Sequence, residues 1–373
     1  FGDVPIVHSN LQMLNNGTYT NVAKTKRSDV YEYIIMTLEE AMTLLQKSAA
    51  AGRIDYYAAE ALLAKVYLTK AGVSGSLDQN DLQNAVKYAK DVIDNSGRTL
   101  TPKYSDIFRM KPEQYQQTGE ELFTWHWQAA EQVWTSQNSI QCDVGLTGFS
   151  ETGSLWGDWK GPSIDLQEAF GASAIDNPAT RVDTDDRRQA TMMLFGDQFE
   201  YFWTDMGGFN FYRFFYDPAY CPSGLESNAS NKQFGCATGA NYVKHIYGDV
   251  YDHKVACNVE PQGMYNALPT HILRLGDIYL VYAEAAFLTG DPSTALDYVN
   301  QIRERAHAEP LDAVDYEAIW KERRLELAER VVVRDAPQHR PHAPRRLRPR
   351  RIVLGPRTPH VKRLRRLDVD VRS

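Results

Sequence analysis

The sequence predicts a mainly α-helical protein, in which stacked helical hairpins carry an irregular lobe rich in aromatic residues. Three observations favour this fold class. Apolar residues recur at helical spacing in the first and last parts of the chain, and one helix-turn-helix pattern occurs twice there. In the middle of the chain the helical spacing fades and aromatic residues cluster. With 43% hydrophobic residues among 373, the chain can bury a substantial core.

The clearest hairpin lies between residues 269 and 330. Small or apolar residues fall on one face of a helix, namely Leu273, Gly276, Tyr279, Leu280, Ala283, Ala286 and Phe287. Gly290 ends this helix, and Asp291 followed by Pro292 supplies an N-cap and a first-turn proline for a second helix. Small residues let two antiparallel helices approach closely, which is typical of a tetratricopeptide-type hairpin.

The same pattern appears earlier in the chain. LAKVYLTKAG, which ends at Gly72, and YAEAAFLTGD, which ends at Asp291, share one arrangement of small, apolar and aromatic residues. We predict helices at 58–72 and 80–93, preceded by a helix from an N-cap at Ser28 to about Lys47. One hairpin cannot bury its apolar side alone, so the repeat indicates a helical platform built from residues 28–95 and 269–330. Two unrelated hairpins would give the same local pattern.

The sequence changes character between residues 101 and 268. Gly, Pro, Asn and Ser become frequent, and six of the seven tryptophans lie here. Aromatic-rich loops on a helical scaffold indicate a functional surface, so we predict a ligand-binding lobe. Residues 121–128 are expected to form a short strand whose face of Phe123, Trp125 and Trp127 packs into the core. Residues 162–170 are expected to form one or two helical turns.

Aromatic rings beside short polar side chains suit a sugar ligand. A pyranose has an apolar face of C–H groups, which a tryptophan or tyrosine can cover while polar side chains bind the hydroxyls. The candidate residues are Trp134 with Asn138, Trp156 beside Asp158, Tyr201 with Trp203, and a second set of Tyr212, Arg213 and Tyr216. For each aromatic residue, the alternative is a packed core position.

No catalytic motif of a zinc protease, α/β-hydrolase, P-loop or dinucleotide-binding protein occurs, which predicts a non-enzymatic protein without a cofactor. A glycosidase needs only two acids at a suitable distance, so that alternative stays open. His126, between two tryptophans, is interpreted as structural. Asp183, Asp185 and Asp186 lack the glycine and distal glutamate of a calcium loop, and we interpret their segment as a solvated turn with an Asp–Arg pair.

Charged residues near the end of the second hairpin are predicted to be structural. Glu322, Arg323, Arg324 and Glu326 lie on a helix at spacings that permit ion pairs, so we expect a network fastening the last helix to the platform.

The cysteines do not have the spacing of a metal site, and we predict none. They are Cys142, Cys221, Cys236 and Cys257. Cys221 with Cys236 is the pair that we would test first for a disulfide, the alternative being four thiols. No apolar run reaches the length of about 18 residues that a transmembrane helix needs.

Three segments in order resemble the C-terminal signature of the SusD/RagB family, the glycan-binding outer-membrane lipoproteins of Bacteroidetes. They are ILRLGDIYLVYAEAAFLTGD, ALDYVNQIRERA and IWKERRLELA. Further matches lie in FGDVPIV, GRIDYYAAEALLAKVYL, GEELFTWHWQ, GPSIDLQEAF with DDRR, and NYVKHIYGD, so the resemblance covers most of residues 1–330.

The resemblance implies a single domain over residues 1–330 that captures oligosaccharide at the bacterial surface without catalysis. It implies a partner, a SusC-like TonB-dependent transporter, that receives the glycan. In the family a lipidated cysteine and several helices precede FGDVPIV, so we expect a truncated N-terminus and a membrane anchor outside this chain. The alternatives are a glycoside hydrolase on a helical scaffold and a peptide-binding tetratricopeptide scaffold.

Residues 331–373 differ sharply from the rest. They contain 12 Arg, one Lys and no aromatic residue, whereas residues 1–330 carry 28 basic and 45 acidic side chains. The acidic body disfavours a nucleic-acid partner. One interpretation of residues 331–373 is a basic tail that binds RNA, lipid or heparin. Our hypothesis is a reading-frame shift near Glu329, which would leave a tail too polar and proline-rich to pack.

Overall fold

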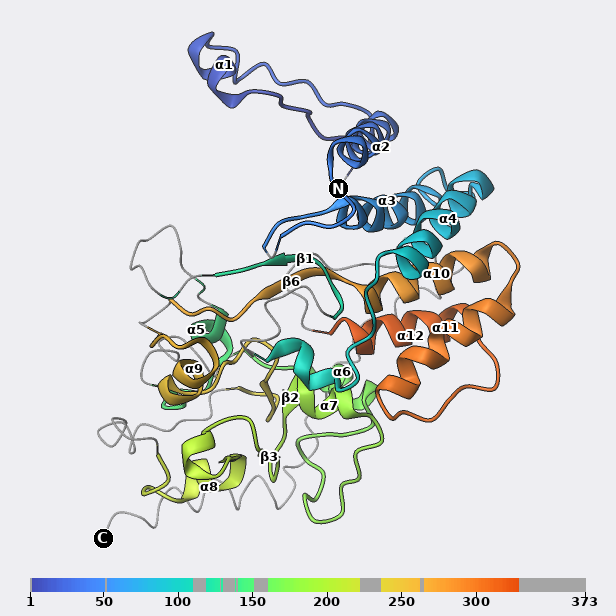
Figure 1. Cartoon of the computed structure of the whole chain (residues 1–373). Helices are drawn as coiled ribbons and strands as arrows, with labels where there is room; N and C mark the ends of the chain where they lie inside the picture. The colour runs from blue at the N-terminus through green and yellow to red at the C-terminus, as the bar shows by residue number, and fades with distance from the viewer. Residues whose placement is uncertain are drawn as a thin grey trace, which may run out of the picture. The chain divides into compact units, whose positions relative to one another are not determined.

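The structure is a computed structural model that describes residues 2–50, 52–109, 119–127, 129, 138, 140–150, 160–221, 236–261 and 265–328. Over these residues the chain is mainly helical, with three small two-stranded sheets (Figure 1), and the predicted fold class is confirmed. None of the helices among these residues combines the length and the apolar character needed to cross a membrane. The predicted tail at 331–373 lies outside the described residues.

The platform is a row of packed helices from both ends of the chain. Its members are α2 (Arg27–Leu44), α3 (Tyr56–Lys70), α4 (Gln79–Asn95), α10 (Leu275–Leu288), α11 (Pro292–Arg305) and α12 (Tyr316–Glu326). Helix α3 packs between α2 and α4, α4 packs on α10, and α10 contacts both α11 and α12 (Figure 1). The two predicted hairpins therefore join into one platform through α4 and α10.

Side-chain caps explain where several of these helices begin. The carboxylate of Asp291 accepts a hydrogen bond from the Thr294 backbone N–H at 3.0 Å, and Pro292 follows as predicted. Asp55 caps α3 in the same way, through the Ala58 backbone N–H. The prediction of Ser28 as an N-cap was wrong, because α2 already begins at Arg27 and the Ser28 hydroxyl donates to Asp29 instead.

The core of the platform uses small side chains where helices meet. Its buried members include Ala61, Leu63, Ala64, Leu82, Ala85, Ala89, Val92, Leu275, Ile278, Val281 and Ala285. Alanines from α3, α4 and α10 share this core, so the helix axes can come close together and the larger leucine, isoleucine and valine side chains fill the space between them.

A two-stranded sheet connects the platform with the lobe. Strand β1 (Glu121–Trp125) pairs antiparallel with β6 (Thr270–Arg274), and Trp125 lies opposite Thr270. The sequence pattern assigned the beginning of β6 to a helix, and this was wrong, because helix α10 starts only at Leu275. Leu122 is the β1 side chain that packs into the platform core beside Leu273.

The expected core face of β1 was also wrong in part. Phe123 packs against the platform core as predicted, but Trp125 is 48% exposed, and the fully buried residue of the strand is Leu122. Alternation along a strand separates two faces but does not tell which face a neighbouring layer covers. Here the platform core takes up Leu122, Phe123 packs against that core, and Trp125 is left half exposed.

The lobe consists of short elements between α4 and β6. They are η1 (Tyr104–Phe108), α5 (Ile140–Val144), α6 (Ile164–Ala169), α7 (Asp186–Thr191), β2 (Met192–Met193), β3 (Gln198–Phe199), η4 (Thr204–Met206), β4 (Phe209–Asn210), α8 (Phe211–Tyr216), β5 (Asn241–Tyr242) and α9 (Val250–Cys257). Near the N-terminus lies one more helix, α1 (Asn10–Asn15). Strand β2 pairs with β5, and β3 pairs with β4. Helix α6 confirms the turns predicted at 162–170.

Aromatic side chains build a separate core inside the lobe. Its fully or nearly fully buried members include Phe149, Phe199, Phe202, Trp203, Phe209, Phe211, Phe214 and Tyr220. Much of the aromatic content that the sequence assigned to a ligand-binding surface is therefore the packing of the lobe itself.

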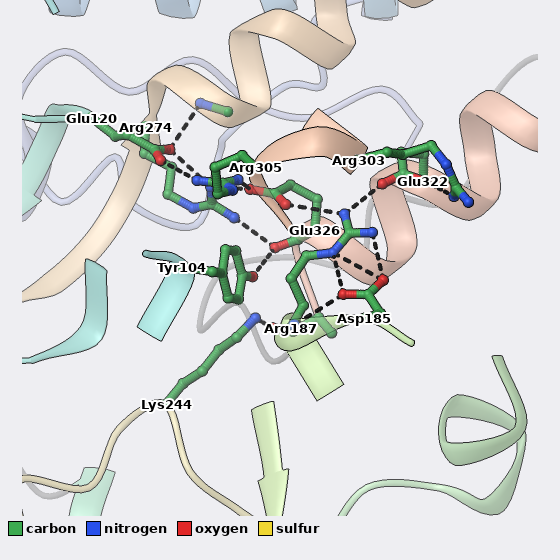
Figure 2. A network of polar contacts seen from close by, with 12 residues as sticks. Tyr104, Glu120, Asp185, Arg187, Lys244, Arg274, Arg303, Arg305, Glu322 and Glu326 are labelled. Atoms are coloured by element: carbon green, nitrogen blue, oxygen red, sulfur yellow. Dashed lines mark hydrogen bonds and ion pairs between the residues drawn. The ribbon is translucent and has the colours of Figure 1, made fainter. Parts of the chain in front are cut away.

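Buried charges fasten the lobe to the platform (Figure 2). Arg187 of α7 has no exposed surface and donates to both carboxylate oxygens of Asp185. Its Nη1 also donates to Glu322 at 2.5 Å and to Glu326 at 3.2 Å, both on α12. The Asp–Arg pair predicted in this segment is therefore confirmed. The prediction that the segment is solvated was wrong, because Arg187 and Arg188 are both buried.

Glu326 is the centre of this network (Figure 2). It accepts hydrogen bonds from Arg274 and from Arg305, each at 2.5 Å, and both arginines also bind Glu120 ahead of β1. The Tyr104 hydroxyl donates to the Glu326 backbone carbonyl at 2.5 Å. Burial opposes ionisation of Glu326, but the surrounding arginines outweigh it and lower its pKa. The predicted fastening of the last helix is confirmed.

Candidate functional site

A hollow with aromatic walls lies between strand β1 and the turn before α3. It has a volume of about 340 Å³ and is lined by Gly52, Arg53, Ile54, Arg98 and the seven residues from Glu121 to Trp127. We call it the tryptophan groove. Gly52 has φ +78°, a left-handed conformation that glycine adopts without strain, and the resulting turn places Arg53 and Ile54 along the groove.

Two tryptophans give the groove its apolar surface. The Trp125 and Trp127 rings lie 6.2 Å apart between centroids and are perpendicular. Trp127 is held in place because its indole N–H donates to the Thr270 hydroxyl at 3.0 Å. Trp125 is half exposed, so part of its ring is open to a ligand.

Arg98 ties the two sides of the groove together. Its Nη2 donates to Asp55 at 2.8 Å, and its Nε donates to the backbone carbonyl of Glu121. Since Asp55 also caps α3, the guanidinium links the start of that helix to β1. These contacts use Nε and Nη2, and no described residue accepts from Nη1.

Glu121 is the one carboxylate among the described residues that line the groove. One of its oxygens lies 3.6 Å from Nε2 of His126, and the other lies 3.9 Å from Nδ1 of His271. Burial lowers the pKa of His271. Its Nε2 donates to the Ile107 carbonyl at 2.7 Å, which leaves Nδ1 to accept from the Thr124 hydroxyl at 3.0 Å.

A second exposed aromatic surface lies on α8. Tyr212 and Tyr216 are both 50% exposed, and their rings stack with centroids 4.7 Å apart. Between them in sequence, Arg213 pairs with Asp217 at 2.7 Å and lies over the Tyr220 ring. Of Tyr212, Arg213 and Tyr216, which the sequence named as a second set, the structure stacks the two tyrosines and directs Arg213 to Asp217 and Tyr220. We call Tyr212 and Tyr216 the tyrosine pair.

The other predicted aromatic pair is not on the surface. Trp203 has 0% exposure, and its indole N–H donates to the Phe149 carbonyl at 3.0 Å. The prediction that its ring faces a ligand was wrong, because the ring fills the aromatic core of the lobe. Tyr201 is partly buried, and the guanidinium carbon of Arg109 covers its ring at 3.8 Å from the centroid.

Asn138 is buried, and its amide nitrogen is used within the protein. Its Nδ2 donates to the Leu268 carbonyl at 2.9 Å and to Asn266 at 3.1 Å. Its predicted polar contact with a ligand therefore does not fit this position. Trp134, Trp156 and Asp158 lie outside the described residues.

The structure bears on three further sequence interpretations. Cys221 and Cys236, the pair considered for a disulfide, are separate thiols. Among the residues that the structure describes, no group of three or more His, Cys, Asp or Glu side chains is arranged to hold a metal ion. His126 lines the groove with its ring near Glu121, and no described contact gives it the role of a catalytic base.

Residues 82–330 match the family model described as the SusD family. The chain belongs to this family. The match covers α4, the whole lobe and the second hairpin, so the family assignment rests on the domain and not on one motif.

Similar proteins agree with the SusD assignment. A "SusD-like protein" from Bacteroides ovatus is 29% identical over 334 residues, which are 87% of this chain and 53% of that protein. A crystal structure with a xylogluco-oligosaccharide is 27% identical with a TM-score of 0.66, and the alignment covers 87% of this chain and 58% of that one. A "laminarin binding SusD-like protein" has the same fold at 20% identity and a TM-score of 0.56, over 87% of this chain and 63% of that one. This SusD chain thus spans little more than half the length of such relatives.

Sequence reasoning missed the tryptophan groove as a site. Trp125 and Trp127 were assigned to the core because they alternate along a predicted strand. Arg53 and Arg98 gave no signal, because they approach β1 only after α3 and α4 have packed. The available signal was composition: a strand with two tryptophans and a histidine in three residues is unusual for a fully covered face.

Proposed function

We propose that this SusD chain binds oligosaccharide at the bacterial cell surface without catalysis and passes it to a SusC-like TonB-dependent transporter. The observation that carries the binding proposal is the half-exposed Trp125, set at right angles to Trp127 in a groove that also presents Arg98 and Glu121. An aromatic face with charged hydrogen-bonding groups beside it suits the C–H face and hydroxyls of a pyranose.

Family membership and one relative support the same ligand class. The structure at 27% identity contains a xylogluco-oligosaccharide, and the present chain aligns with it over 87% of its length. The family resemblance supports the transporter partner and a lipid-anchored place at the outer membrane as further parts of the proposal. These parts of the proposal need their own test, by co-purification with a transporter.

The proposed contact residues come from two surfaces. The tryptophan groove contributes Trp125 and Trp127, and the tyrosine pair with Arg213 extends the binding surface on α8. Trp134, Trp156 and Asp158 remain candidates from the sequence. We leave out Trp203 and Asn138, because both side chains are buried.

The size of the contact suggests reversible capture. Covering about 80 Å² of one ring at about 25 cal/mol per Å² contributes about 2 kcal/mol before ordering costs. Two or three such rings give a dissociation constant from micromolar to millimolar. Hydrolysis is less suited to the groove, since a glycosidase uses two carboxylates and the described lining holds one, Glu121.

Affinity electrophoresis in gels containing neutral and acidic polysaccharides tests the proposal. We expect retardation by at least one glycan, and we expect Trp125→Ala to weaken it at least tenfold. Tyr33→Ala is the matched control, because Tyr33 is also exposed but lies on α2. Unchanged mobility of the unmodified chain in every glycan would reject saccharide binding. Retardation that Tyr212→Ala/Tyr216→Ala abolishes and Trp125→Ala does not would place the site on α8 alone.

A further inference from the structure

We infer that the tryptophan groove is built for an acidic saccharide, with a hexuronate ring against Trp125 and its carboxylate at Arg53 and Arg98. This inference rests on the proposed function, because it assigns a ligand class to the groove described above. It follows from the charges that line the groove and not from the family, whose relatives named above are described with xylogluco-oligosaccharide and laminarin.

Arginines outnumber carboxylates among the described residues that line the groove. These residues include Arg53, Arg98 and one carboxylate, that of Glu121, and Arg98 pairs with Asp55 outside the lining. Glu121 already lies close to two imidazoles, at 3.6 Å from His126 and 3.9 Å from His271. Glu121 belongs to β1 and Arg53 to the turn before α3, and no ion pair joins their side chains.

Arg53 is exposed, and no ion-pair partner lies among the described residues. Its backbone N–H donates to the Ala50 carbonyl at 3.0 Å, which fixes the turn while the side chain lies along the groove. A guanidinium without an ion-pair partner in the described part of the chain is a local site of positive potential in a protein body with 28 basic and 45 acidic residues.

Arg98 adds a second donor at the same place. Its side chain is 11% exposed and is fixed by Asp55 and the Glu121 carbonyl. Nη1 is the donor that these contacts leave open, and Arg98 lines the groove. A guanidinium held in advance loses little freedom when it binds a carboxylate, so the contact costs less than one with a mobile side chain.

A hexuronate matches this arrangement better than a neutral hexose. Its ring offers the same apolar face to Trp125, while its carboxylate replaces a neutral hydroxymethyl group and accepts from one or both arginines. A charge-assisted contact at a partly buried arginine gives about a tenfold preference over the neutral ring, and that preference weakens as salt screens the charge.

The test is isothermal titration calorimetry with matched ligands. Oligogalacturonate, oligoglucuronate and oligomannuronate are each compared with the same oligosaccharide after reduction of its carboxyl groups. At least one acidic form should bind about tenfold more tightly than its reduced form in 50 mM salt, and this ratio should fall in 500 mM salt. Arg53→Gln should bring the ratio to about two or below while leaving the affinity for the reduced form unchanged.

Two controls separate the inference from the proposed function. Lys26→Gln removes an exposed cation away from the groove and should leave the ratio unchanged. Trp125→Ala should weaken both forms of the ligand alike. Equal affinity for acidic and reduced forms, or a preference that survives Arg53→Gln, overturns the acidic assignment and leaves saccharide binding intact. If no saccharide binds, whether acidic or neutral, both the acidic assignment and the proposed saccharide binding are overturned.

Discussion

Arg274 and Glu326 form a buried ion pair that joins the end of β6 to the end of α12. Nη1 of Arg274 lies 2.5 Å from the Glu326 carboxylate, and Nη2 donates to the Glu326 backbone carbonyl at 2.6 Å. Two residues 52 positions apart in sequence thus contact through both side chain and main chain. Because Glu326 also binds Arg187 of the lobe, this pair lies where the platform and the lobe meet (Figure 2).

Replacing Glu326 by Gln should destabilise the fold strongly. The change leaves Arg274, Arg305 and Arg187 buried with less compensating charge, and breaking a buried pair costs about 3–5 kcal/mol. The free energy of unfolding from urea titration measures this. Arg324→Gln is the control on the same helix, since Arg324 pairs with the exposed Asp165 and should cost at most about 1 kcal/mol. Equal effects of the two variants would contradict a central role for the buried network.

The same pair predicts sensitivity to acid. The pKa of Glu326 is lowered in the folded state, so its contribution to stability is present above the unfolded-state pKa and is lost as pH falls through the folded value. Wild type should therefore lose stability between about pH 5 and pH 2, and Glu326→Gln should lose less over the same interval. Parallel stability curves for the two proteins would contradict this assignment.

Gly276→Ala should destabilise the protein although alanine favours helices. A methyl group at this α10 position would lie 2.6 Å from Nη1 of Arg274 and 2.8 Å from Oε1 of Glu326. The intrinsic helix gain is about 1 kcal/mol, and the displaced buried charges should outweigh it, for a net loss of about 2 kcal/mol. Ser293→Ala, exposed in the first turn of α11, is the control and should stay within about 0.5 kcal/mol in thermal unfolding.

Gly276 also shows how far the sequence alone could go. The pattern identified a small residue on the buried face of a helix and explained it by close helix packing. The structure adds a reason that no local pattern contains, namely space for charges from Arg274, Glu326 and Glu120. Those three residues come from separate segments of the chain, so their meeting depends on the tertiary fold.

Helical periodicity could be predicted well because it is a local property. Asp291 and Pro292 mark the start of α11 in both sequence and structure, and α3 and α4 begin and end within two residues of the predicted limits. The site was less predictable, because exposure of an aromatic ring depends on which layer covers it. Trp125 and Trp203 illustrate this: the ring assigned to the core is half exposed, and the ring assigned to the surface is buried.

Glu60→Gln should stabilise the platform at alkaline pH. Burial and the nearby Asp91 raise the pKa of Glu60 to about 8. Because the folded-state pKa is raised, protonation of Glu60 contributes its full stabilisation below the unfolded-state pKa near 4.5. That contribution to stability is lost as pH rises through about 8. Gln mimics the protonated form, so the melting temperature should rise by about 2–6 °C at pH 8.5 and hardly change at pH 5.

The surroundings of Glu60 provide the control for that experiment. Tyr56 lies 3.5 Å away through its hydroxyl, and Lys47 lies over the Tyr56 ring. Tyr56 has a pKa raised to about 12, so it does not titrate in the range used. Asp91→Asn should remove part of the repulsion, lower the pKa of Glu60 and so reduce the loss of stability as the pH rises. A pH dependence unaffected by either change would contradict the assignment to this pair.

Trp203→Phe should lower stability without changing saccharide affinity. Phenylalanine loses the N–H that donates to the Phe149 carbonyl at 3.0 Å, and it leaves a small cavity among Phe149, Phe209 and Tyr220. The lost hydrogen bond and cavity together should cost about 2–3 kcal/mol in urea unfolding. Since the ring has no exposed surface, calorimetric affinity for any bound saccharide should stay within about twofold below the unfolding transition. Loss of affinity in a folded Trp203→Phe protein would return Trp203 to the binding site and contradict its assignment as a core residue.

Trp125→Ala should have the opposite effect. Because the Trp125 ring is half exposed, its removal should lower saccharide affinity with little change in the free energy of unfolding.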